Sequence, residues 1–232
     1  MRALRGTGMA RQLPSTVGGY YADPMTTPSP ALSIALDETS DPPLRPLPPS
    51  VAQLLAELAA PPRLVAHLRA VHEVAAQLVE WAGGHCPELA VDREAVLFGA
   101  ATHDIGKVLH PEELSGPGAR HEEAGRELLL ARGVPAALAR FAGGHATWDA
   151  PGAGVEDLLV SLADKVWKNK RVPGLEDLVV AELARAGGRP VWEEFLALDT
   201  FLTGVGEDAD RRLAWQAAHP VGARARGIRV NP

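Results

Sequence analysis

A histidine and an aspartate stand side by side at His103 and Asp104, among small apolar residues. The surrounding pattern predicts one helix over residues 93–107, capped by Asp92, with both polar groups on its packed side. An ionised carboxylate is costly to bury unless it is paired or binds a metal. Lys107 lies one turn further on and reaches the same region. The remaining partners must come from elsewhere in the chain.

Other polar residues also fall on or beside apolar helix faces. His72 shares a stripe with Leu68 and Val79, whereas His67 lies about 140° around the same helix. Any one of these residues alone has an ordinary explanation, such as a hydrogen-bonded core histidine or an exposed loop residue. Taken together, imidazoles and carboxylates on separate helices suit Fe, Mn, Co, Ni or Zn. The predicted set is His72, His103, Asp104, His121, His145 and Asp164.

The elements that must position these residues are helices. Apolar residues recur at helical spacing, and period-two alternation typical of strands is absent. The sequence therefore predicts an all-α domain, a compact bundle of about seven to nine helices, with Ser50 capping the first. The expected helical segments are 51–60, 63–84, 93–107, 119–133, 136–144, 155–170, 174–188, 191–202 and 207–218.

The chain divides by composition into three parts. Residues 1–49 are rich in Pro, Ser, Thr and Gly, which predicts a flexible, disordered or loosely packed N-terminal extension that can hold a short helix over residues 31–38. Residues 50–220 form the helical domain, with the metal site within 60–175 and helical cover over 175–220. Residues 221–232 form a basic C-terminal tail.

Composition narrows the classes of partner. The net charge is −6, which argues against nucleic-acid binding, because phosphate contacts need a basic surface. Cys86 is the single cysteine, so no disulfide forms within the chain, and a reducing cytoplasmic location is expected. No apolar run approaches the ~20 residues that span a bilayer, so no membrane partner is expected.

The order of these residues resembles the H…HD…H…H…D pattern of the HD-domain superfamily. The motifs are "ATHDIGK", "RHEEAGRELL", "GGHATW" and "LADKVWK", and the likeness covers roughly residues 60–175. The version with two extra histidines is similar to the binuclear phosphohydrolases, including the subgroup that hydrolyses diadenosine polyphosphates. The "GYP" segment of the cyclic-dinucleotide phosphodiesterases is absent, which disfavours that activity.

The resemblance implies a division of roles. His72, His103, Asp104 and Asp164 would hold one divalent metal, and Asp104 would bridge to a second one held by His121 and His145. Iron or manganese is favoured, and cobalt, nickel or zinc would also suit. A hydroxide between the metals would attack phosphorus. Asp104 and Lys107 are the expected catalytic residues, with Lys107 stabilising the phosphoryl oxygens.

Two details stay open at this level. His110 lies in the short Gly/Pro-rich segment before His121 and competes with it as a ligand, although His121 is favoured because it heads a helix. Six residues near the expected site mouth could stack a base or bind phosphate, or simply pack: Trp148, Lys165, Trp167, Lys168, Asn169 and Arg171.

The favoured function is hydrolysis of a small phosphorylated molecule, such as a nucleotide. One alternative is a di-iron oxygenase built on the same ligands. The other is a non-catalytic module that senses a nucleotide, which the full ligand set argues against, since buried polar groups are costly to keep. The amphipathic segment 191–202 closes the core or mediates a homodimer.

Overall fold

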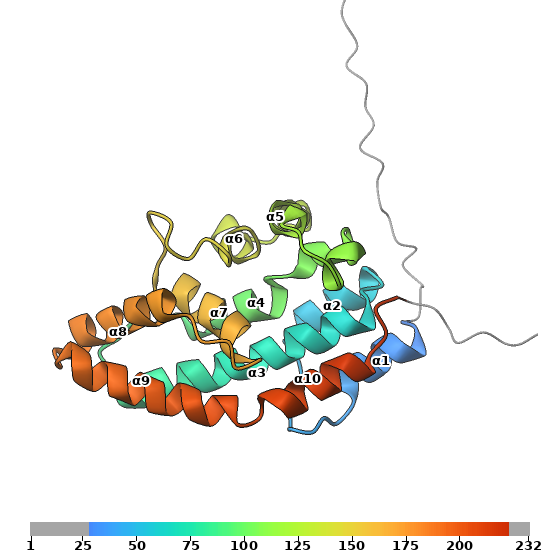
Figure 1. Cartoon of the computed structure of the whole chain (residues 1–232). Coiled ribbons are helices and arrows are strands. Elements are labelled where there is room, and N and C mark those ends of the chain that lie inside the picture. Colours follow the sequence, from blue (N-terminus) through green and yellow to red (C-terminus); the bar gives the residue numbers. More distant parts are fainter. Residues whose placement is uncertain (1–27, 223–232) are drawn as a thin grey trace, which may run out of the picture.

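The computed structural model describes residues 28–222. This part of the chain is all-helical, with ten α-helices, two short 3-10 helices and no strand (Figure 1). The residues outside it include the first 27 of the expected extension and nearly all of the basic tail. In chain order the helices are α1 Pro30–Asp37, α2 Pro49–Glu57, α3 Pro62–His85, α4 Arg93–Thr102, η1 Ile105–Val108, η2 Pro111–Leu114, α5 Arg120–Ala131, α6 Ala136–Gly144, α7 Val155–Val166, α8 Pro173–Gly187, α9 Val191–Gly206 and α10 Ala209–Ala218.

Helix starts follow from local chemistry. Proline occupies the first turn of α1, α2, α3 and α8, where its missing N–H costs nothing. Asp92 caps α4 as predicted, with its Oδ1 accepting from the Ala95 N–H at 3.0 Å. Ser50 does not cap the first helix of the domain. Pro49 already sets the helical φ one residue earlier, so Ser50 lies within the first turn of α2.

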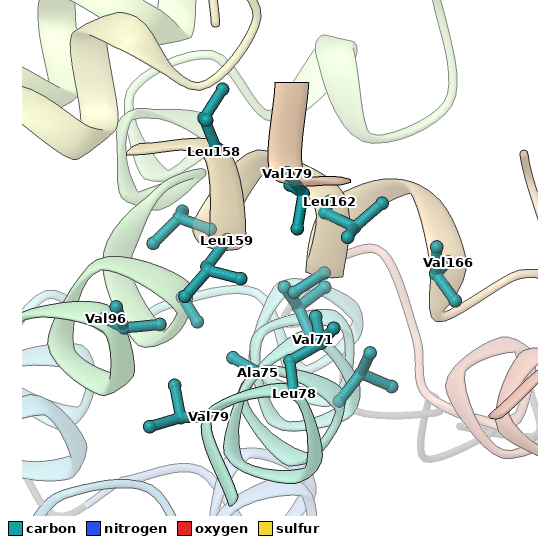
Figure 2. Close-up of a cluster of buried hydrophobic side chains, with 14 of the residues drawn as sticks. Val71, Ala75, Leu78, Val79, Val96, Leu158, Leu159, Leu162, Val166 and Val179 are labelled. Carbon is teal, nitrogen blue, oxygen red and sulfur yellow. The ribbon is translucent and has the colours of Figure 1, made fainter. Parts of the chain in front are cut away.

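The long helix α3 runs through the middle of the molecule (Figure 1). It packs against α1, α4, α7 and α10, and it is buried on almost every side. In Figure 2 the side chains of Leu159 and Leu162 on α7 meet those of Val71 and Leu78 on α3. Each such fully buried side chain contributes roughly 1.5–3 kcal/mol. This core fixes the distance between the two helices that carry the first and last polar residues of the site.

Residues 28–49 correct the expectation of a loose extension for their part of the chain. They lie against α3, and most of their buried apolar side chains belong to a cluster with Leu64 and Leu68. Leu32, Ala35 and Leu47 are each at most 5 % exposed. The apolar residues spaced between the prolines supply enough burial to order this segment, which composition alone did not indicate.

The segment around His103 is not one continuous helix. α4 ends at Thr102, His103 is its C-cap, and Asp104 takes φ −102° and ψ 11° before the 3-10 helix η1 begins. A Cβ on Gly106 would lie 1.9 Å from the carbonyl oxygen of His121. The small residue therefore lets the backbones of η1 and α5 come into contact.

Across the described residues, no helix has the length and apolar character that crossing a membrane requires.

Candidate metal centre

Six polar side chains meet at one point where α3, α4, α5, α6 and α7 come together. Each is at most 8 % exposed. Five of them belong to the set predicted from the sequence, and the sixth is His67. The full set is His67, His103, Asp104, His121, His145 and Asp164.

The first trio consists of His67, His103 and Asp164, whose ligand atoms all lie within 4.8 Å of one another. The Nε2 atoms of the two histidines are 3.2 Å apart. Asp164 Oδ1 is 3.7 Å from His67 Nε2 and 3.4 Å from His103 Nε2. α3, α4 and α7 thus each deliver one donor atom to the same small volume.

The second trio consists of Asp104, His121 and His145. Asp104 Oδ1 lies 3.0 Å from His121 Nε2 and 3.6 Å from His145 Nε2. Asp104 Oδ2 faces the first trio instead, 3.1 Å from His67 Nε2. The two oxygens of this one carboxylate therefore face different trios, which is the arrangement of a bridging ligand.

Hydrogen bonds on the outer side of the site fix three of the four rings. His103 Nδ1 donates to the Ala100 carbonyl at 2.9 Å, and His145 Nδ1 donates to the Ala142 carbonyl at 3.2 Å. His121 Nδ1 donates to Glu113 Oε2 at 2.6 Å. Carbonyl and carboxylate oxygens only accept, so the proton sits on Nδ1 in each ring. The Nε2 lone pairs then face inward.

The Nε2 atoms of these rings face carboxylate oxygens, and that of His103 also faces the ring nitrogen of His67. His121 Nε2 is buried, lacks a hydrogen-bond donor among the described residues, and faces an oxygen of Asp104. Acceptors that converge in a buried space repel one another unless a cation lies between them. Outer-side partners on Nδ1 are also the usual arrangement for metal-binding histidines. The donor set consequently fits divalent metal ions.

The two carboxylates and His145 are in metal-binding ionisation states, whereas at His103 and His121 burial is outweighed by neighbouring carboxylates, which raise the ring pKa. A metal ion bound there would displace those protons. Burial opposes ionisation of Asp104, yet the neighbouring histidines hold the pKa of its carboxyl well below the usual range. Burial also opposes ionisation of Asp164, but the hydrogen bond and charge of His103 together with the charge of Lys165 lower its pKa. Burial lowers the pKa of His145 to about 4, so its ring is neutral at pH 7. Anionic carboxylates and a neutral imidazole are the forms in which these groups bind metal.

A pocket of about 430 Å³ opens against this cluster. Lys107 and Lys165 line it, and each ammonium donates to a site carboxylate at 2.5 Å, Lys107 to Asp104 and Lys165 to Asp164. Leu213 and Gln216 of α10 form part of the wall. Lys107 therefore lies beside Asp104 and lines the pocket.

His72 lies outside both trios, which corrects its assignment as a ligand. It follows His67 by five residues, about 7.5 Å along α3 and about 140° around it. Its ring is 5 % exposed, and burial lowers its pKa to about 4. His72 is a neutral core histidine, and His67 occupies the position that His72 was predicted to fill.

The structure also shows where the alternative ligand His110 and the six residues expected near the site mouth lie. His110 lies beside Glu112 and belongs to neither trio. Of the six residues expected near the mouth, Lys165, Trp167 and Lys168 line the pocket. Arg171 instead forms ion pairs with Glu176 and Asp199. Trp148 packs at the edge of the hydrophobic core, and Asn169 lies against Gly206.

Two residues that form or support the metal centre were not predicted from the sequence. His67 had a signal, because Val71, Val74 and Leu78 continue its stripe as well as the chosen residues continue that of His72. Glu113 had none, since it is an isolated acid in a Gly/Pro-rich segment and only the fold brings it to His121.

Comparison with known proteins agrees with this geometry. The family model of the HD domain matches residues 64–167, a span that contains all six clustered side chains. No curated protein and no solved structure matched the chain.

Proposed function

We propose that this chain, whose residues 64–167 match the family model of the HD domain, is a metal-dependent phosphohydrolase acting on a nucleotide or another small phosphoester. HD domains belong in general to a superfamily of metal-dependent hydrolases. The observation that carries the proposal is the split of the Asp104 carboxylate, with one oxygen facing each trio. Two ions held on either side of one carboxylate suit attack on phosphorus, where charge develops on both the attacking and leaving oxygens.

Each proposed ligand has a definite place. One ion would be held by His67, His103, Asp164 and Asp104 Oδ2, and the other by His121, His145 and Asp104 Oδ1. When bound, the ions supply a water of lowered pKa and offset the charge of the phosphoryl group. The five mixed nitrogen and oxygen donors besides the bridge favour iron or manganese, and they also suit cobalt, nickel or zinc.

The chain's own groups complete the chemistry. The Lys107 side chain is 18 % exposed in the pocket, so its ammonium can pass from Asp104 to a phosphoryl oxygen as charge develops there. Leu114, Trp167 and Leu213 line the pocket and limit its water content, which strengthens such contacts. His121 and His145 keep their rings aligned through their Nδ1 bonds, so a bound ester meets a preorganised site.

The test pairs metal analysis with a substrate panel. We expect about two transition-metal ions per chain, and release of phosphate from at least one nucleotide or small phosphoester. Asp104→Asn should abolish both metal binding and hydrolysis, whereas Asp149→Asn, an exposed aspartate outside the pocket, should change neither. A metal-free protein would overturn the metal site, and iron-dependent oxygen consumption without phosphate release would favour an oxygenase.

A further inference from the structure

The pocket beside the metal centre is rich in cations for an acidic protein. The chain has a net charge of −6, yet among residues 28–222 three lysines line this pocket, and Glu122 is the only acidic lining residue besides the two site aspartates. The lysines are Lys107, Lys165 and Lys168. Bound divalent ions would offset the aspartates, so the lysines would leave the pocket positive.

The three lysines are not equivalent. Lys107 and Lys165 are each engaged by a site aspartate. Lys168 forms no ion pair with any acidic residue of the part of the chain that the structure describes, and its ammonium lies 5.7 Å from the centroid of the Trp167 ring. The positive charge of Lys168 therefore lines the pocket without being paired to a carboxylate of the described residues.

The turn that presents Lys168 is held on both sides. The buried side chain of Arg212 donates from Nε to the Trp167 carbonyl at 2.7 Å. Asn169 adopts a left-handed φ of 57°, and its side chain lies so close to Gly206 that a Cβ there would meet its Oδ1 at 2.6 Å. The backbone around Lys168 is consequently fixed by α9 and α10, which lowers the entropy lost when its side chain binds a ligand.

We infer that the substrate carries a second anionic group besides the phosphoryl group that reacts, and that Lys168 binds this second group. The inference rests on the proposed phosphohydrolase function. Asp164 and Lys168 are one helical turn apart, with Cβ atoms about 6 Å from each other. A phosphate held at the metal centre would thus leave Lys168 to a neighbouring anion, and a diphosphate unit has that chemistry. Lys168 is a specificity-determining residue that selects diphosphate-containing molecules over monoesters.

Binding of two simple anions tests this without any turnover. Pyrophosphate and orthophosphate are titrated into the metal-loaded protein at a buffered free-metal concentration, with metal content checked afterwards. We expect pyrophosphate to bind more tightly. Lys168→Gln should weaken pyrophosphate binding about tenfold while orthophosphate changes by less than about twofold. Lys170→Gln removes an exposed lysine two residues away that does not line the pocket, and it should alter neither affinity.

The outcomes separate this inference from the proposed function. Equal binding of the two anions by the wild type, or an equal loss of both in Lys168→Gln, would overturn the role of Lys168 while leaving phosphohydrolase activity standing. A preference for pyrophosphate that depends on Lys168, together with no hydrolysis across the substrate panel, would uphold the anion site and overturn the enzyme.

Discussion

Glu113 holds the ring and the backbone of His121 through a single carboxylate oxygen. Its Oε2 accepts from His121 Nδ1 at 2.6 Å and from the His121 N–H at 3.1 Å. Its Oε1 accepts from the Arg120 N–H at 3.2 Å. A Cβ on Gly118 would lie 2.3 Å from that Oε1, so the glycine makes room for the contact. Among the four site histidines, His121 alone has an outer carboxylate partner in the described residues.

Loss of the Glu113 charge should weaken metal binding. A carboxylate partner makes an imidazole a stronger donor and fixes its orientation, and loss of such partners typically lowers metal affinity by about 10–100-fold. We expect Glu113→Gln to show a loss of this size in metal titrations. Glu112→Gln changes the exposed neighbouring acid and should bind metal like the wild type. Unchanged affinity in Glu113→Gln would show that Glu113 only packs.

His67 and His72 form a matched pair on one helix. Both are buried, but only His67 lies in a trio. We expect His67→Ala to lose bound metal and His72→Ala to retain it when metal content is measured by elemental analysis. Metal loss in His72→Ala with retention in His67→Ala would contradict the ligand set proposed here. Unfolding curves of both metal-free variants separate ligand loss from general destabilisation.

The buried ring of His72 should make stability fall in acid. Its pKa is about 4 in the folded protein, against an ordinary value of 6.5. Between these values the unfolded chain binds a proton that the folded chain does not, so stability is present above pH 6.5 and decreases as the pH falls to about 4. The full effect is about 3 kcal/mol at most.

His72→Leu removes this titration. The variant should therefore show a shallower loss of unfolding free energy between pH 6.5 and pH 4.5 than the wild type, measured by urea denaturation of metal-free protein. His110→Leu serves as the control, because His110 lies outside the packed core, and its slope should match the wild type. Equal slopes for His72→Leu and the wild type would be incompatible with a buried, neutral His72.

Gly106 should tolerate no side chain. A Cβ at this position would lie 1.9 Å from the His121 backbone oxygen, which cannot move without displacing α5. We expect Gly106→Ala to lower the free energy of unfolding by about 3 kcal/mol or more and to reduce metal content. Gly84→Ala, on an open face of α3, should instead be neutral or stabilising by up to about 1 kcal/mol. Denaturant unfolding and elemental analysis measure both effects.

The all-α architecture could be predicted from the sequence because the helical spacing of apolar residues is a local property of each segment. The pattern did not distinguish His67 from His72, since α3 is buried nearly all round and either face looks like an inward one. The end of α4 at Thr102 was also not predictable, because it depends on the close contact between Gly106 and His121 of another helix.

The candidate site also contains some residues that the local sequence indicated and others that it did not. Residues with a strong local context, such as His121 at a helix start and His145 after its glycines, lie beside Asp104 and remain proposed ligands. Glu113 and Gln216 could not be found, because each reaches the site only through packing between distant segments. The residues next to them in the sequence do not indicate that contact.

The position of α10 in the chain has a consequence for biosynthesis. All six clustered side chains lie between residues 67 and 164 and are translated before α10, which supplies Leu213 and Gln216 to the pocket wall and Arg212 to the Trp167 turn. During synthesis, all six clustered side chains are therefore made before the helix that completes the pocket beside them.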